Sequence, residues 1–177
     1  TSTDVTITFD CDNTDPAPVN TGLNTLLLSA SDSPVPDVVA LAAATLGIVD
    51  VTDENNIGAF AVASVNVGAS ATISVTADVG SADLPIAFLL CETDPTTAAC
   101  TNPTVASASP VSLTIASDAT PTFSIFVTST GGVPFDPGAN RVFVRFKDSD
   151  GVTRGSTSVA VRTVVLESAL AMSGAVT

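Results

Sequence analysis

Apolar and polar residues alternate with a period of two along most of the chain, a pattern typical of β-strands with one buried face. Val142, Val144 and Phe146 share one face, while Arg141, Arg145 and Lys147 take alternate positions. Further strands are expected at residues 23–29, 60–67, 72–77, 84–90, 111–115, 123–127 and 152–162. Many short strands separated by turn residues predict an all-β fold: an immunoglobulin-like antiparallel β-sandwich with additional N- and C-terminal strands.

The secondary structure of two segments near the N-terminus is less clear from the sequence. Val5, Ile7, Phe9 and Cys11 share one face and predict an N-terminal strand at residues 3–11, either exchanged between subunits or added to the sheet. Residues 37–45 are rich in alanine, which favours a helix, and contain adjacent valines, which favour a strand. Their secondary structure stays open at this point.

The alternation shifts by one position near the C-terminus. Up to residue 163 the apolar positions of the last strand are odd, and beyond it they are even: Val164, Leu166, Leu170 and Met172. A pleated strand cannot change face without a bulge or a break. We therefore expect a sandwich domain at 1–163 and an extension at 164–177. The extension is a strand donated to a neighbour or paired within its own chain, although its spacing also fits a helix.

Three runs resemble a recurring unit of bacterial secreted and surface proteins, the immunoglobulin-like or cadherin-like repeat. They are FAVASVNVGASATISV at 60–75, PTFSIFV at 121–127 and RVFVRFKDSDGVTRGSTSVAV at 141–161. The resemblance covers roughly residues 36–163. It implies a β-sandwich used mainly as a spacer or building unit.

Cys91 and Cys100 bracket a loop that contains the turn signal Asp94-Pro95. We expect a disulfide here, because the spacing does not suit zinc and the chain has no histidine to complete a metal site. Cys11 is then left over, either as a buried thiol or as a link to another chain. Cysteine pairing favours a secreted or cell-surface protein. No signal segment heads the chain, so we expect either that a signal peptide has been removed or that this is a fragment of a longer protein.

Five basic and eighteen acidic residues give a net charge of −13. Nucleic acid and anionic membrane surfaces are therefore unsuitable partners, because both require basic side chains. The longest near-apolar stretch, residues 35–49, is too short and too interrupted to cross a bilayer, so no membrane insertion is expected.

Histidine, tryptophan and tyrosine are absent, which removes the commonest general base and the usual catalytic triads. We therefore expect no enzyme and no cofactor other than calcium. Asp148 and Asp150 begin a sequence like a calcium loop, and Asp50 and Asp53 lie in another oxygen-rich stretch. Ordinary turn chemistry explains the same residues, since turns favour Asp, Asn and Gly.

Phe126 and Phe143 take outward positions on their expected strands, so they form a contact with another subunit unless the N-terminal segment covers them. With the apolar tail, they predict a structural subunit of an extracellular filament, pilus-like fibre or surface layer. Its partners are then copies of itself, joined by β-strand contacts. The alternative is an adhesin or calcium-dependent binding module that recognises a cell-surface or matrix ligand.

Overall fold

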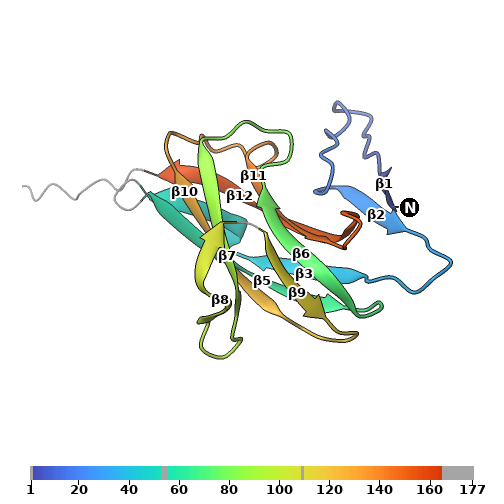
Figure 1. Cartoon of the computed structure of the whole chain (residues 1–177). Helices are drawn as coiled ribbons and strands as arrows, with labels where there is room; N and C mark the ends of the chain where they lie inside the picture. The colour runs from blue at the N-terminus through green and yellow to red at the C-terminus, as the bar shows by residue number, and fades with distance from the viewer. Residues whose placement is uncertain (1, 53–55, 109, 165–177) are drawn as a thin grey trace, which may run out of the picture.

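The computed structural model describes residues 2–52, 56–108 and 110–164, which form a β-sandwich with a separate N-terminal hairpin (Figure 1). The first sheet has the order β3-β5-β10-β7-β8, with bounds Val38–Ala43, Ile57–Asn66, Thr122–Ser129, Ile86–Thr93 and Cys100–Ala108. The second sheet has the order β4-β12-β11-β6-β9, with bounds Ile48–Thr52, Thr153–Val164, Arg141–Lys147, Ala71–Asp78 and Val111–Ile115. The described residues contain no helix with the length and apolar character needed to cross a membrane.

The strand order confirms the predicted immunoglobulin-like sandwich. The order β3-β5-β10-β7 matches the A-B-E-D sheet of that fold, and β12-β11-β6 matches its G-F-C sheet. Strands β4 and β12 pair in parallel, while the other described strand pairs are antiparallel. Within the sandwich, the first strand, β3, therefore lies in the first sheet, and the last described strand, β12, lies in the second.

The segment left open at residues 37–45 is mainly the strand β3. Val38 is buried, and β3 pairs along β5 from Val38 opposite Asn66 to Ala43 opposite Ala61. A short 3-10 turn, Thr45–Gly47, then carries the chain into the second sheet, with positive φ angles at Leu46 and Gly47. Pairing and burial of the β-branched residue outweigh the helical preference of the alanines here.

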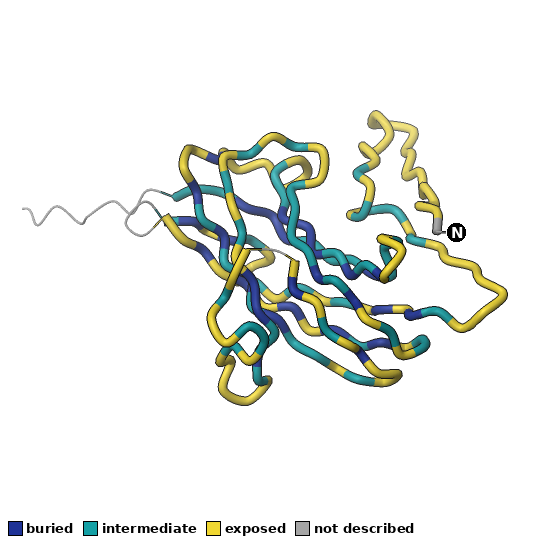
Figure 2. The backbone as a smooth tube through the Cα atoms, in the orientation of Figure 1, coloured by how far each residue is buried: buried dark blue, intermediate teal, exposed yellow. Residues whose placement is uncertain are grey.

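The core lies between the two sheets, and its strands show the predicted alternation (Figure 2). In β10, Phe123, Ile125 and Val127 are fully buried, while the residues between them are partly exposed. Phe123 meets Phe146 of the opposite sheet edge to face, with ring centroids 5.6 Å apart. This geometry is favourable for aromatic pairs and joins the centres of the two sheets.

A buried asparagine fixes one end of the sandwich. The Asn66 side chain is fully buried and donates to the carbonyl oxygens of Ala69 and Ile115 at 2.8 and 3.1 Å. Its Oδ1 accepts the backbone N–H groups of Asp37 and Gly68, each at 3.1 Å. Asn66 therefore connects β5 with the end of β9 and the start of β3, so all its polar atoms are satisfied.

The N-terminal strand is shorter than the sequence predicted and joins neither sheet of the sandwich. Strand β1, Ser2–Thr6, pairs with β2, Thr25–Ser29, in a separate two-stranded sheet. Figure 1 shows this hairpin beside the sandwich. Residues 7–10 are irregular, and Cys11 forms an isolated bridge with Thr14. The alternation of apolar and polar residues in the sequence therefore extends to Cys11, whereas the pairing of β1 with β2 ends at Thr6.

At the other end, β12 includes Val164, which pairs with Thr52 of β4. The break expected after residue 163 is therefore not a break in β12, because parallel pairing with β4 continues through that position. Leu166, Leu170 and Met172, the other predicted contacts of the tail, lie outside the described residues.

Candidate interaction surfaces

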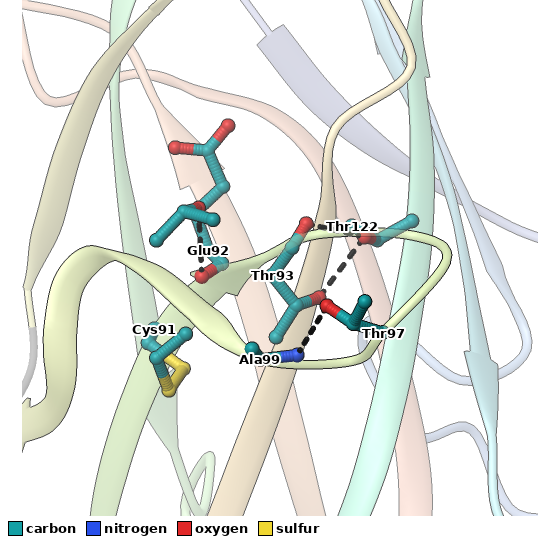
Figure 3. Close-up of a disulfide and its surroundings, with 8 residues drawn as sticks. Cys91, Glu92, Thr93, Thr97, Ala99 and Thr122 are labelled. Atoms are coloured by element: carbon teal, nitrogen blue, oxygen red, sulfur yellow. Dashed lines mark hydrogen bonds between the residues drawn. A yellow bond between two sulfur atoms is a disulfide. The ribbon is translucent and has the colours of Figure 1, made fainter.

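Cys91 and Cys100 form the predicted disulfide, which closes the loop between β7 and β8 (Figure 3). Their Cα atoms are 5.6 Å apart, and Cys91 is fully buried. Beside it, the hydroxyl groups of Thr93 and Thr122 are 2.9 Å apart and connect β7 with β10. A disulfide is typical of proteins folded under oxidising conditions. The third cysteine, Cys11, is an exposed free thiol.

Asp94 shapes the loop inside the disulfide. Its carboxylate accepts the backbone N–H groups of Thr97 and Thr96 at 2.9 and 2.8 Å, and these bonds lower its pKa. The Asp94 N–H also donates to the carbonyl oxygen of Ala99 at 2.9 Å. Asp94, which is partly exposed, is thus used as a turn residue.

Two of the acidic residues considered for calcium, Asp148 and Asp50, each form a salt bridge with an arginine. The Asp148 carboxylate is 2.6 Å from Arg154 Nε and also accepts the N–H groups of Val152 and Asp150. Burial alone would raise the pKa of Asp148, but these hydrogen bonds outweigh it and hold the pKa below its ordinary value. The Asp150 residue is exposed in the same turn.

Asp50 lies on β4, where its carboxylate is 2.6 Å from Arg162 Nε. Asp53 lies outside the described residues. Among the residues that are described, no three His, Cys, Asp or Glu side chains gather in a group that could hold a metal ion. The carboxylates of Asp148 and Asp50 are therefore each engaged with a guanidinium group, whereas a calcium site gathers six or more oxygens in one place.

The outer face of the second sheet carries the positive charge of the molecule. All five basic residues of the chain lie on β11 or β12: Arg141, Arg145, Lys147, Arg154 and Arg162. Arg145 is paired with Asp78 at 2.7 Å and lies over the ring of Phe143, 4.8 Å from its centroid. This face therefore combines charged and aromatic groups in paired arrangements.

Phe143 points away from the core but is only 6% exposed. The N-terminal segment and the loop after β6 cover it, since a Cβ atom at Gly22 would lie 3.3 Å and one at Gly80 3.0 Å from its ring. Phe126 belongs to the other sheet, where it pairs with Ala59 and Leu89. The two phenylalanines therefore do not form an exposed pair. Phe143 is covered by residues of its own chain, which was the alternative expectation.

The N-terminal segment, defined as residues 2–29, contacts the second sheet of the sandwich. Gly22 lies on Phe143, and Arg154 Nη1 donates to Ser29 Oγ at 3.0 Å. A cavity of about 430 Å³ separates the hairpin from β12 and β3. Figure 2 shows most of this segment as exposed. Its large exposed apolar residues are Val5, Ile7, Phe9, Val19, Leu23, Leu26 and Leu28.

The outer face of the first sheet is a surface that the sequence reasoning did not identify. Strands β3, β5 and β10 contain no charged residue, and β7 contains a single one, Glu92. Glu92 pairs with Phe123, a core residue, so its position does not belong to the outer set. The sequence of β5 contained a sign of this surface, because residues 57–63, IGAFAVA, are apolar at both alternating sets of positions.

No protein-family model matches this chain, and no curated protein matches it. Among solved structures, the N-terminal domain of PorA is similar with a TM-score of 0.40 and 10% sequence identity. The match covers 72% of this chain and 97% of the PorA domain. A TM-score of 0.40 is too low to support a conclusion about fold or function.

Proposed function

We propose that this chain is a structural subunit of an extracellular filament or surface layer, assembled from copies of itself through β-strand contacts. The observation that carries the proposal is the N-terminal segment, a hairpin that lies outside both sheets of the sandwich while its apolar side chains are exposed. An isolated two-stranded hairpin is marginally stable in water. It gains stability when a further strand or an apolar surface covers it.

The hairpin has one face suited to such a contact. Because Val5 pairs with Leu26 and Thr3 with Leu28, these side chains lie on the same face of the β1–β2 sheet. Leu26 and Leu28 are each 56% exposed. The opposite face includes Leu27 and Asp4, which line the cavity toward β12 together with part of Leu26. An exposed strand edge next to an apolar face is a known template for pairing with another chain.

The connection between hairpin and sandwich supports exchange between subunits. Residues 30–34 are exposed, and Pro34 restricts the backbone there, whereas from Val35 onward the chain is hydrogen-bonded to the sandwich, where Val35 accepts the N–H group of Ala69 at 2.9 Å. The same contact at Phe143 can then be made by the N-terminal segment of a neighbour. Such a contact joins two different surfaces, so repetition gives an open chain of subunits rather than a closed dimer. The acidic net charge and the disulfide support an extracellular setting.

The test compares the wild-type chain with the double variant Leu26→Glu/Leu28→Glu. Multi-angle light scattering at rising concentration is expected to show open-ended growth for the wild type and arrested growth for the variant. Leu46→Glu is the matched control, because Leu46 is exposed on the turn between β3 and β4 and outside the N-terminal segment. A wild-type chain whose mass stays constant with concentration overturns the proposal.

A further inference from the structure

We infer that the open edge of β12 accepts residues 165–177 of a second copy of this chain as an added strand. The inference rests on the proposed function, because it supplies a second strand contact between successive copies. It concerns the backbone of the sandwich and the C-terminal tail, and not the exposed face of the hairpin.

Strand β12 is paired on both edges only in its second half. β4 pairs with residues 160–164, whereas residues 153–159 pair with β11 and with no other described strand. At about 3.3 Å per residue, this half-paired stretch spans about 23 Å. The first half of β12 is therefore a free sheet edge, although β4 closes the same edge further along.

The backbone groups on this edge are available to a further strand. The Val161 N–H donates to the carbonyl oxygen of Asn140, on the β11 side, at 3.0 Å. Because the direction of these groups alternates along a strand, the N–H groups of Ser156 and Ser158 point to the open side. Neither group has a hydrogen-bond partner among the described residues. Free backbone groups along a strand edge are the template that β-augmentation uses.

The cavity between the hairpin and the sandwich follows this edge. It is lined by residues 154–158 of β12 and 37–40 of β3, with the hairpin as the opposite wall. Five consecutive residues of β12 contribute to it, so the cavity runs along the strand rather than around one side chain. An extended segment in this position contacts β12, β3 and the hairpin together.

The tail has the apolar pattern that such a position requires. In an extended strand, Leu166, Leu170 and Met172 point to one face. The cavity offers apolar side chains to that face from both the hairpin and β3. They are Leu23, Leu26, Leu27, Val38 and Val39.

The tail also starts at the right place and has sufficient length. Figure 1 shows the end of β12 and the hairpin on opposite sides of the sandwich. Copies repeated in this direction bring the end of one β12 toward the open edge of the next. Residues 165–177 reach about 43 Å when extended, which covers the edge and leaves several residues to connect the subunits. The incoming strand then runs parallel to β12, as β4 does.

The position of β4 selects a second copy as the donor. β4 occupies the edge of β12 from Ala160 to Val164, directly before the tail begins. A tail that turned back on its own subunit would have to pass over β4 before it reached Ser158. The tail of a neighbour enters from the other end of the edge and meets no such obstacle.

Charge favours the C-terminal tail over the N-terminal segment as the added strand. Residues 165–177 have a single charged side chain, Glu167, whereas residues 2–16 contain four aspartates. In a chain of net charge −13, the tail therefore meets less repulsion from a second copy. Arg141 also lines the cavity, and its guanidinium donates to hydroxyl and carbonyl oxygens rather than to a carboxylate of the described residues.

A fluorescently labelled peptide of residues 165–177 tests the acceptor edge. The receiving chain is the full chain with Leu170→Asp/Met172→Asp, because its own tail then no longer competes. Fluorescence anisotropy is expected to show saturable binding of the peptide. A peptide that carries the same two substitutions is expected to bind at least about tenfold more weakly, since its carboxylates would have to lose water at the contact.

Proline substitutions in the receiving chain locate the contact. Ser156→Pro removes an N–H group that β12 does not use to pair with β11, so the fold tolerates it while the added strand loses a hydrogen bond. Binding is expected to weaken at least about tenfold. Ser112→Pro is the matched control, because by the same alternation the Ser112 N–H lies on the free edge of β9. Circular dichroism checks that both variants fold.

Hydrogen exchange measured by nuclear magnetic resonance gives a second readout that needs no proline variant. Addition of the peptide is expected to slow exchange of the Ser156 and Ser158 N–H groups at least about tenfold. Exchange at Ser112 is expected to stay the same. This measurement decides the matter if Ser156→Pro does not fold.

Three results overturn the inference: a peptide that does not bind, binding that leaves exchange at Ser156 and Ser158 unchanged, or equal binding by folded Ser156→Pro. Light scattering of the wild-type chain separates this inference from the proposed function. Open-ended growth without peptide binding removes the inference and leaves the proposed function. Peptide binding at Ser156 in a chain that never grows supports the acceptor edge and contradicts the proposed function.

Discussion

The backbone carbonyl group of Val38 in β3 lies directly against Gly155 of β12. It occupies the space that a Cβ atom on residue 155 would fill. This contact closes the sandwich at one side, because β3 is an edge strand of the first sheet and β12 belongs to the second. The Ala42 N–H also donates to Thr157 Oγ1 of β12 at 3.1 Å.

Gly155→Ala is expected to destabilise the fold by roughly 1 to 3 kcal/mol, since the new methyl group meets backbone that no side-chain rotation can move. Thermal unfolding followed by circular dichroism measures the change. Gly132→Ala is the control, because a Cβ atom there meets nothing within 4 Å. Equal melting temperatures for the two variants would show that β3 and β12 do not approach each other this closely.

The Asp148–Arg154 pair is expected to contribute to stability in a pH-dependent way. The two side chains are 7% and 10% exposed, so removal of one partner by Asp148→Asn is expected to cost about 3 to 5 kcal/mol. Asp50→Asn breaks a more exposed pair and is expected to cost less than about 1 kcal/mol. Chemical denaturation at neutral pH measures both, and a smaller loss at Asp148 than at Asp50 would contradict this account.

The sign of the pH effect follows from the lowered pKa of Asp148. Its contribution is fully present above the pKa of an unfolded aspartate, about 3.9, and is lost as the pH falls through the lower folded value. The difference in unfolding free energy between wild type and Asp148→Asn should therefore shrink as the pH is reduced below about 4. A difference that grows on acidification would contradict the assignment.

Calcium is expected to leave the melting temperature unchanged. Asp148 and Asp50 each hold an arginine, so a calcium ion would have to displace a guanidinium group from both. Differential scanning fluorimetry with millimolar calcium, followed by chelation, measures the effect. A rise in melting temperature that Asp148→Asn abolishes would instead support a calcium-dependent binding module.

Removal of the disulfide by the double variant Cys91→Ser/Cys100→Ser is expected to reduce the free energy of unfolding by about 2 to 3 kcal/mol. The loop it closes is short, and the hydrogen bonds of Asp94 and Thr93 remain to shape it. Guanidinium denaturation measures the loss, and the strand content is expected to persist in the far-ultraviolet spectrum. An unchanged stability would mean that the loop is fixed by these hydrogen bonds alone.

The sequence predicted the parts of the fold that depend on local alternation. Val142, Val144 and Phe146 are buried as expected, and the disulfide joins the two cysteines that the spacing selected. Alternation shows which way a side chain points, but it does not show what covers it. Phe143 points outward as predicted, yet Gly22, about 120 positions earlier in the chain, lies on it. Long-range contacts of this kind have no local signal.

The same limit explains the surface that the sequence reasoning missed. The charge-free face of the first sheet arises only when β3, β5, β10 and β7 lie side by side, and β10 is about 60 residues from its neighbour β5. Much of β5 and β7 reads as a buried strand, because apolar residues at both alternating positions usually mean burial on both sides. Pairing shows that one of these two sides is open.

Negative-stain electron microscopy of the purified full chain tests the central claim most directly. The account predicts fibres or sheets for the wild type and dispersed particles for Leu26→Glu/Leu28→Glu at the same concentration. Dispersed single particles of the wild type, at concentrations where the folded protein is intact, would contradict it.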